Sequence, residues 1–348
     1  MPEQVRQLSH LFEVFSYFGS LIYSMSPIKT YQQWIEQEIK KNRYGKTPAT
    51  LYEPIRYLMA IGGKRLRPIL VLLSYSLYKD DTKSIIPYAT AVELFHNFTL
   101  MHDDIMDNAP LRRGNVTVHE KWNVNTAILS GDVMQVKVYD MLLSLPGETL
   151  KTVITFFNQC ATEVCEGQQW DMEFETMNTV TEAQYIEMIR QKTAVLLGFS
   201  LELGAILANA SLDDRKALRE FGVNIGIGFQ LKDDLLDAYA DPKKFGKQLG
   251  GDIIANKKTY LLIKALEKAT GTTKKELQAQ LSLMKFNKVK KVKSIKEIYN
   301  SLGIPSLAEK KIDHYFIKGF RALDTLNISP DKKQNLVLFA KDLISRQS

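Results

Sequence analysis

Two aspartate triplets are the residues whose types and spacing most clearly indicate chemistry in this 348-residue chain. Both read Asp-Asp-X-X-Asp, and together they comprise Asp103, Asp104, Asp107, Asp233, Asp234 and Asp237. Positions i and i+4 of an α-helix lie about 40° apart, so the first and last aspartates of each triplet share one helix face. Stacked like charges destabilise an isolated helix, and a bound divalent cation would compensate for them. Mg²⁺ is the obvious candidate, because it combines one or two carboxylates with water and phosphate oxygens.

The sequence around the triplets favours a metal site over the alternative, a solvated acidic helix face. Such a face would explain a single triplet equally well. Here, however, largely apolar stretches precede both copies, at residues 95–101 and 227–231. Carboxylates in that context are seldom simply solvated. The repetition therefore predicts two carboxylate sites for a divalent cation.

Basic residues are grouped where an anionic substrate would need them. The clusters comprise Lys64, Arg65 and Arg67 beside two glycines, Arg112 and Arg113 after the first triplet, and Lys247, Lys257 and Lys258 after the second. Any one cluster alone is more often a surface feature. Three clusters, two of which trail acidic triplets, predict a phosphorylated substrate, because phosphate binds both Mg²⁺ and the forked donors of arginine.

Helices must position these residues. Apolar residues recur at three- and four-residue steps with almost no strand-like alternation, which predicts an all-α fold. The length and the 45% hydrophobic composition fit one large domain with a sizeable core. We expect a catalytic domain over residues 31–348 and an N-terminal extension, residues 1–30, that stays loose or packs on the outside. The lysine-rich run 274–296 is interpreted as a solvated helix face.

Several features bear on location and partners. The apolar patch 11–23 is interrupted by Glu13 and Gly19, is too short to span a bilayer and follows no basic cluster. Cys160 and Cys165 have no partner set for a metal site and are interpreted as reduced thiols. We therefore expect a cytoplasmic protein without a signal peptide or membrane anchor. The net charge of +7 is compatible with a phosphorylated substrate, an anionic surface or nucleic acid.

The ordered set of motifs resembles the trans-polyprenyl diphosphate synthases, a family that includes farnesyl and geranylgeranyl diphosphate synthases. The resemblance runs from about Tyr31 to the last helices. It rests on residues 62–68, the first triplet with Arg112-Arg113-Gly114, Gly167-Gln168 with Asp171, Lys192-Thr193, Gln230 with the second triplet, and Gly246-Lys247 through Lys257. It implies the isoprenoid synthase fold, a single large helical bundle with a central apolar cavity. It also implies a homodimer, with the apolar stretch 127–145 as a candidate interface.

Carried over residue by residue, the resemblance implies three Mg²⁺ per active site. Asp103 and Asp107 would hold two ions against an allylic diphosphate, Asp233 would hold the third, and Asp104 and Asp237 would support them. The positions matching the isopentenyl diphosphate site are Lys64, Arg67, His96 and Arg113. The positions matching the allylic diphosphate site are Arg112, Lys192, Thr193, Gln230, Lys247 and Lys257. His96 also lies within about 20° of the Asp103 face, so simple packing near the site is the alternative for this residue.

The reaction that the resemblance implies is a head-to-tail prenyl transfer. Metal ions and basic side chains, Lys192 and Lys257 among them, stabilise the departing diphosphate, and the allylic carbon–oxygen bond breaks toward a carbocation. The double bond of a positioned isopentenyl diphosphate attacks this cation, and loss of a proton completes the cycle.

Product length depends, in the family, on side chains just before the first triplet. Phe98 stands five residues before Asp103, and the smaller Thr99 stands four before it. This combination resembles enzymes that make the twenty-carbon geranylgeranyl diphosphate. A core role for Phe98, and a farnesyl or longer product, stay open as alternatives.

Three other classes of protein are alternatives to a synthase. A terpene cyclase would have one such triplet and no isopentenyl diphosphate pocket, and a non-catalytic regulatory subunit would lack some of the aspartates. A helical nucleic-acid-binding protein would carry its basic residues on an exposed stripe, away from carboxylates that repel the phosphate backbone. The two intact triplets argue against all three.

Overall fold

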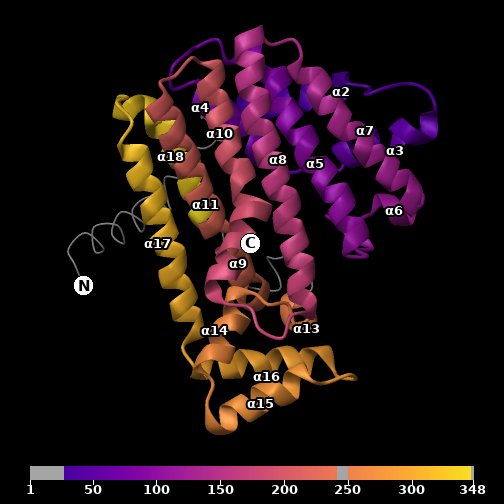
Figure 1. Cartoon of the computed structure of the whole chain (residues 1–348), viewed down its shortest axis with the longest axis vertical. Coiled ribbons are helices and arrows are strands. Elements are labelled where there is room, and N and C mark those ends of the chain that lie inside the picture. The colour runs from indigo at the N-terminus through magenta and orange to yellow at the C-terminus, as the bar shows by residue number, and fades with distance from the viewer. Residues whose placement is uncertain (1–26, 241–249, 346–348) are drawn as a thin grey trace. The chain divides into compact units, whose positions relative to one another are not determined.

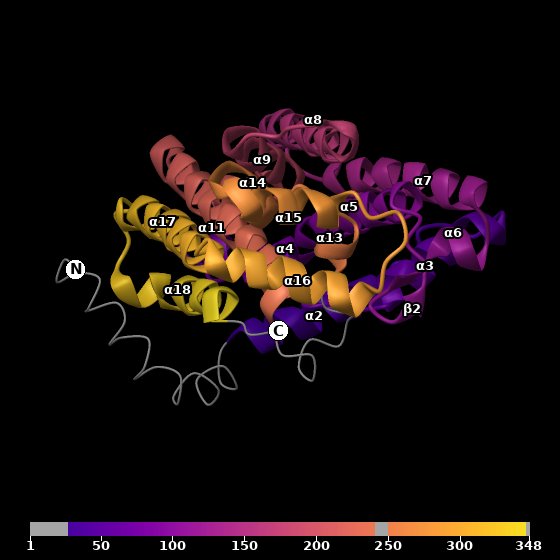
Figure 2. The ribbon, with the colours of Figure 1, turned by 90° about the horizontal axis from the view of Figure 1, so that it is seen from below.

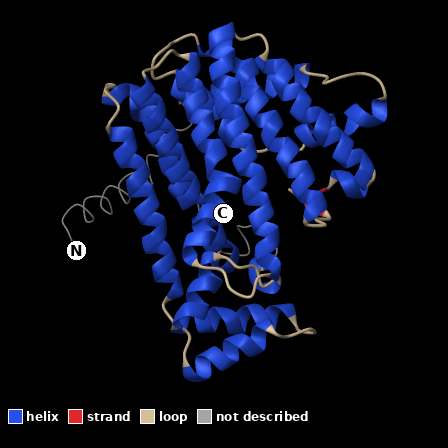
Figure 3. Ribbon diagram, viewed as in Figure 1, coloured by secondary structure: helices blue, strands red, loops and turns tan. Residues whose placement is uncertain are grey.

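Helices form nearly all of the structure, a computed structural model that describes residues 27–240 and 250–345 (Figure 3). The strands of this part are those of one short antiparallel hairpin, in which β1 (Leu111–Arg112) pairs with β2 (Asn115–Val116). The predicted all-α class is confirmed. Among the helices described, none combines the length and the apolar character needed to cross a bilayer.

The chain is organised in two compact units. Unit 1 comprises residues 1–146 and 329–336, and unit 2 comprises residues 147–328 and 337–348. The predicted boundary after residue 30 stays a prediction, because helix α2 begins at Pro27 and residues 1–26 lie outside the described part.

Unit 1 is built from helices joined by short connections. They are α2 (Pro27–Lys41), α3 (Ala49–Ala60), α4 (Leu66–Tyr75), the 3₁₀ turn η1 (Thr82–Ile85), α5 (Ile86–Met106), α6 (Val118–Lys121) and α7 (Val124–Leu142). α5 packs against both α4 and α7. Gly131 lets α7 approach α5 closely, since an added Cβ would lie 2.2 Å from Nε2 of His102. This packing holds the first triplet, at the end of α5, in a fixed place within unit 1.

Unit 2 contains the longer helices of the described chain. They are α8 (Gly147–Thr176), α9 (Glu182–Ile189), the π-helical turn η2 (Arg190–Ala194), α10 (Val195–Leu207), α11 (Leu212–Tyr239), α13 (Gly251–Ile254), α14 (Tyr260–Lys268), α15 (Gly271–Leu281), α16 (Lys288–Ser301) and α17 (Ile304–Asp324). The last helix, α18 (Pro330–Ser345), crosses the boundary between the units.

The core of unit 2 is a layer of helices around α10. Every residue from Val195 to Ile206 is buried, as expected of a helix that is apolar nearly all round. α10 packs against α8 and α11, and α11 packs against α17 (Figure 1). The second triplet lies in the last two turns of α11, so this core fixes its position.

Two glycines let neighbouring helices close on the π-helical turn η2. A Cβ on Gly167 of α8 would lie 2.2 Å from the backbone nitrogen of Lys192, and one on Gly226 of α11 would lie 2.7 Å from Ala194. Since η2 carries Lys192 and Thr193, these contacts fix two of the predicted site residues. π-Helical turns are rare and often mark functional sites.

Candidate functional site

The first triplet ends α5 and is tied to the β-hairpin. Asp103 and Asp104 lie in its last turn, and Asp107 is its C-cap residue. Nε of Arg112, on β1, donates to both carboxylate oxygens of Asp104 at 2.9 Å, and Nη2 lies 3.5 Å from Asp103. The Asp104 side chain is only 3% exposed. Arg112 therefore engages the triplet itself in the structure, and its role at an allylic diphosphate stays a prediction.

Three of the predicted isopentenyl diphosphate residues make contacts within unit 1. Nη1 of Arg67 lies 3.0 Å from Nε2 of His96, and Arg113 donates to the carbonyl of Gly62. The loss of water around the His96 ring, and then the charges of Arg67 and Arg113, lower the pKa of His96 well below its usual range. His96 is therefore neutral at pH 7, and its ring nitrogen accepts a hydrogen bond from Arg67.

Two neighbours in the first basic cluster have different surroundings. Lys64 is exposed, as a ligand for a substrate anion requires. Arg65 is 2% exposed, and its guanidinium pairs with Glu36 and Glu93 at 2.7 and 2.8 Å. The interpretation of Arg65 as part of a phosphate cluster was wrong, because its charge is neutralised inside unit 1. The backbone of Arg65 also adopts φ 48°. The ion pairs with Glu36 and Glu93 therefore hold a left-handed residue in place directly before α4.

The two chain-length residues lie one turn before the triplet. Phe98 is 8% exposed, and its ring packs against those of Phe95 and His102, with centroids 5.6 and 4.8 Å away. Thr99 is partly exposed, and its hydroxyl donates to the carbonyl of His96. His102 in turn lies 3.2 Å from the carbonyl of Ile128, so the Phe98 side of α5 faces α7.

A cavity of about 730 Å³ in unit 2 brings together most of the predicted allylic diphosphate residues. Its polar lining comprises Asp171, Glu175, Thr176, Asn178, Tyr185, Lys192, Thr193, Gln230, Asp234, Asp252, Asn256, Lys257, Lys258 and Thr259. They come from α8 and the loop after it, α9, η2, α11, α13 and the segment between α13 and α14. Lys247 lies in 241–249, outside the described residues.

Asp171 contacts both of the predicted lysines that line the cavity. Its carboxylate accepts from Nζ of Lys192 at 2.5 Å and lies 3.7 Å from Nζ of Lys257. Burial alone would raise the pKa of Asp171, but the charges of Lys257 and Lys192 outweigh it and lower this pKa. The arrangement is a ready anion site, because one carboxylate already occupies the position between two ammonium groups.

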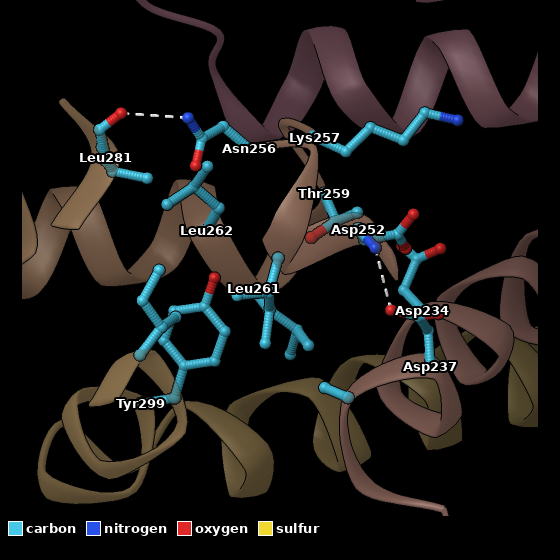
Figure 4. A pocket seen from close by; sticks show the side chains of 13 residues that line it. Asp234, Asp237, Asp252, Asn256, Lys257, Thr259, Leu261, Leu262, Leu281 and Tyr299 are labelled. Carbon is cyan, nitrogen blue, oxygen red and sulfur yellow. Dashed lines mark hydrogen bonds between the residues drawn. The ribbon is translucent and has the colours of Figure 1, made fainter. Parts of the chain in front are cut away.

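Asp234 of the second triplet forms an acidic wall of the same cavity together with Asp252. Asp234 is buried, and it accepts hydrogen bonds from the Tyr185 hydroxyl and from Nε2 of Gln230, the latter at 3.1 Å. Asp237 accepts from the backbone N–H of Asp252 at 3.0 Å (Figure 4). Burial, followed by the charge of Asp252, raises the pKa of Asp234, and burial with the charge of Asp237 raises that of Asp252.

Asp252 and Tyr185 are site residues that the sequence alone did not single out. Asp252 directly follows Gly250-Gly251, a pair that signals a break in helix, and Gly250 adopts φ 74° there. No spacing rule connects it to a triplet fifteen or more residues earlier. Tyr185 stands in an ordinary amphipathic helix, and only the tertiary contact with Asp234 identifies it.

The carboxylates of unit 2 fit a divalent cation. Burial first, and then the neighbouring carboxylates, raise the pKa values of Asp234 and Asp252, and a cation at this wall would stabilise both carboxylates. Within the described residues, no three His, Cys, Asp or Glu side chains could hold an ion by themselves. Water and substrate oxygens would therefore complete the coordination, as is usual for Mg²⁺.

The fold and these two sets of side chains define an all-α enzyme class that acts on diphosphates. Residues 48–300 match the model of the polyprenyl synthetase family. The chain is 40% identical over 300 residues to the short chain isoprenyl diphosphate synthase of Methanocaldococcus jannaschii, covering 86% of this chain and 88% of that one. This chain belongs to the polyprenyl synthetase family, and it is a trans-polyprenyl diphosphate synthase.

Other similar proteins differ in the product that they are named for. A crystal structure of a geranylgeranyl pyrophosphate synthase superposes with a TM-score of 0.88 at 40% identity, covering 93% of this chain and all of the other. The geranylfarnesyl diphosphate synthase of Natronomonas pharaonis is 35% identical over 258 residues, which are 69% of this chain and 76% of that one.

Proposed function

We propose that this chain is an Mg²⁺-dependent prenyltransferase that condenses isopentenyl diphosphate with an allylic diphosphate and makes mainly geranylgeranyl diphosphate. The observation that carries the proposal is the cavity of unit 2, where Lys192 and Lys257 line the same space as Asp234, and this space is of a size that suits a small ligand. The names of similar proteins support the reaction.

The allylic diphosphate is proposed to bind where Asp171 now lies between Lys192 and Lys257. Both ammonium groups would exchange this carboxylate for phosphate oxygens, and the partly exposed Thr193 hydroxyl and Gln230 amide would add hydrogen bonds. Because Lys192 lies on the closely packed turn η2 and Lys257 lies in the short connection between α13 and α14, both ammonium groups are positioned before the substrate binds and can stabilise the departing charge.

Isopentenyl diphosphate is assigned to the basic residues of unit 1. Lys64 and Arg113 are exposed cations, and Arg67 adds a third that is oriented by neutral His96. A neutral imidazole is suited to this task, since it accepts from Arg67 without competing with the substrate as an anion would.

The aspartates would hold three Mg²⁺ ions, two on Asp103 and Asp107 and one on Asp233. When bound, the ions would neutralise the diphosphate and make it a better leaving group. In the reaction the allylic carbon–oxygen bond breaks, and its electron pair leaves with the diphosphate. A carbon–carbon bond forms from the double bond of isopentenyl diphosphate, and one proton passes to the released diphosphate.

The product length is proposed to depend on Phe98. Its ring is buried between Phe95 and His102, so it is well supported as a barrier at the end of a growing chain. Replacing it with alanine would open space on that side of α5. We expect Phe98→Ala to shift the main product beyond twenty carbons.

A homodimer is proposed through α7. Leu129, Val136 and Leu143 are each at least 58% exposed and lie within about 40° of one another, opposite the buried Met134 and Val138. An apolar stripe of this kind suits an isologous interface between two copies. A cytoplasmic location is proposed from the sequence, whose two cysteines are free thiols on one helix.

The test is a product assay with purified protein, Mg²⁺, radiolabelled isopentenyl diphosphate and farnesyl diphosphate. Dephosphorylated products are separated by chain length, and EDTA reactions serve as blanks. Geranylgeraniol as the main product, lost with EDTA and with Asp103→Asn, supports the proposal. Lys310→Gln, an exposed change on α17, is the control and should retain full activity.

Other outcomes would favour the alternatives. A folded protein that incorporates no isopentenyl diphosphate from any allylic starter would favour a regulatory subunit. A cyclic hydrocarbon released from the allylic diphosphate alone would favour a cyclase. A twenty-five-carbon product would support the proposed prenyl transfer but contradict the proposed twenty-carbon product.

A further inference from the structure

The connection between α15 and α16 exposes apolar and basic side chains that the proposed reaction does not use. Met284 is 95% exposed, Val289 is 77% exposed and Leu283 is 39% exposed. Four exposed lysines surround them, Lys285, Lys288, Lys290 and Lys293. These seven residues are named here the hairpin tip patch. Single exposed apolar residues are ordinary, but a group of three within seven positions beside four cations is not.

The helical hairpin of α15 and α16 has a net positive charge nearly as large as that of the whole chain. Residues 274–297 contain eight lysines and two glutamates, a balance of +6, whereas the whole chain carries +7. Among these lysines, Lys291 is buried and donates to Asn256 and to the carbonyl of Ile254 at 2.7 and 3.3 Å. The exposed lysines are therefore presented by a helix that is held firmly to the rest of unit 2.

The packing of α16 determines which side of this helix is exposed at the patch. Ile295, Ile298 and Tyr299 are buried where α16 packs on α13, α14 and α17, and Figure 2 shows α16 beside α14 and α15. Val289, Lys290 and Lys293 lie within about 100° of one another on the opposite side of the helix. Apolar and basic groups thus share one exposed face of α16 next to the tip.

We propose that the hairpin tip patch binds the surface of anionic lipid bilayers reversibly. Met284, Val289 and Leu283 would enter the boundary between headgroups and acyl chains, while the lysines remain at the level of the anionic headgroups. The lysines complement anionic headgroups, and the exposed apolar side chains suit the acyl-chain boundary. Both features therefore favour an anionic bilayer. The residues of the patch contribute nothing to the cavity or to either triplet.

A bilayer fits the patch better than a nucleic acid does. Nucleic-acid surfaces combine cations with exposed aromatic rings on which bases stack. Here the aromatic residue of the tip, Phe286, lies under the Lys291 ammonium with its centroid 4.2 Å away, and the exposed groups are aliphatic. Aliphatic side chains gain from burial in lipid and gain little against a sugar–phosphate backbone.

The proposal goes beyond the prenyl transfer and does not depend on it. It does complement that function, since a polyprenyl diphosphate has an apolar tail and an anionic head. A synthase held at a bilayer would release this product next to the phase into which it partitions.

The test is flotation of the full-length protein, without substrates, with vesicles of phosphatidylcholine alone or containing 30% phosphatidylglycerol, in low salt. Three proteins are compared: wild type, Lys288→Gln/Lys290→Gln/Lys293→Gln, and the control Lys216→Gln/Lys310→Gln/Lys318→Gln. The control removes the same charge from exposed positions on α11 and α17. A fourth variant, Met284→Ser/Val289→Ser, tests the apolar tip.

We expect wild type and the control to bind only the anionic vesicles. The hairpin variant, Lys288→Gln/Lys290→Gln/Lys293→Gln, should bind these vesicles about a hundredfold more weakly, because each lysine contributes about a fivefold gain in binding. The tip variant should bind at least fivefold more weakly, with its charge unchanged.

Equal losses in the hairpin variant and the control would overturn the proposal, because they would show an effect of net charge alone. Binding to neutral vesicles, or to double-stranded DNA and not to vesicles, would also overturn it. Prenyl transfer is measured separately in the absence of vesicles, where the hairpin variant should match wild type within about twofold. Vesicle binding without transfer, or transfer without vesicle binding, therefore separates this proposal from the proposed function.

Discussion

Replacing Gly167 with alanine should damage the proposed allylic diphosphate site without touching a ligand. In an ordinary helix interior, glycine to alanine stabilises by up to about 1 kcal/mol. Gly167 lies where α8 meets η2, and a Cβ there would be 2.2 Å from the backbone nitrogen of Lys192. Since that neighbour is backbone and not a flexible side-chain end, the helices must separate.

The size of the effect follows from this distance. Ordinary contacts of a Cβ begin at 3.4 Å, so relief requires a movement of about 1 Å. Lys192 and its neighbour Thr193 would move with the backbone. A misplacement of that size in a catalytic site costs about a hundredfold in rate, or about 2.7 kcal/mol of transition-state stabilisation.

The assay is steady-state kinetics with varied allylic diphosphate and saturating isopentenyl diphosphate, together with urea unfolding. Gly147→Ala, on the same helix with nothing within 4 Å of the added Cβ, is the matched control and should behave as wild type. We expect Gly167→Ala to lose about a hundredfold in kcat/KM and to unfold more easily. A folded Gly167→Ala that keeps kcat/KM within twofold would refute the view that this close packing positions Lys192.

Three further perturbations test other contacts of the structure. Arg112→Ala leaves the nearly buried carboxylate of Asp104 without its bidentate partner, so the free energy of unfolding in urea should fall by about 2–3 kcal/mol. Arg112→Ala should cost less in a protein that already carries Asp104→Ala. Additive losses of the two single changes would contradict the pairing. Val136→Glu places a charge in the apolar stripe of α7, so sedimentation should show monomers where wild type shows dimers; an unchanged dimer would exclude α7 as the interface. Lys291→Met removes two buried hydrogen bonds around Asn256, so urea unfolding should show a loss of about 1–3 kcal/mol; an unchanged midpoint would mean that this lysine does not brace the segment before Lys257.

Local patterns of the chain were enough to predict the fold class and the grouping of part of the site. The three- and four-residue apolar steps predicted helices, because each helix buries one face. The Asp-Asp-X-X-Asp spacing predicted the shared helix faces, and the order of motifs identified the family. The meeting of Lys192, Gln230 and Lys257 at one cavity agrees with the roles carried over from that resemblance, and the roles themselves stay predictions.

Contacts between distant segments could not be predicted from local patterns. Arg65 and Arg67 are indistinguishable by type and spacing, yet Arg65 is buried with Glu36 while Arg67 reaches His96. The acidic wall gains Asp252 through a glycine turn, and the π-helical turn that displays Lys192 has no sequence signature. In each case the decisive partner is brought in by tertiary packing.

The position of Asp171 between two lysines has a consequence for the energetics of the proposed reaction. The cavity at rest already contains an internal counterion, so substrate binding is an exchange of one anion for another. Lys192 and Lys257 already contact the Asp171 carboxylate, so an arriving diphosphate replaces an anion at these ammonium groups and not water alone. When the reaction ends, Asp171 competes for the same ammonium groups, and this competition favours release of the diphosphate.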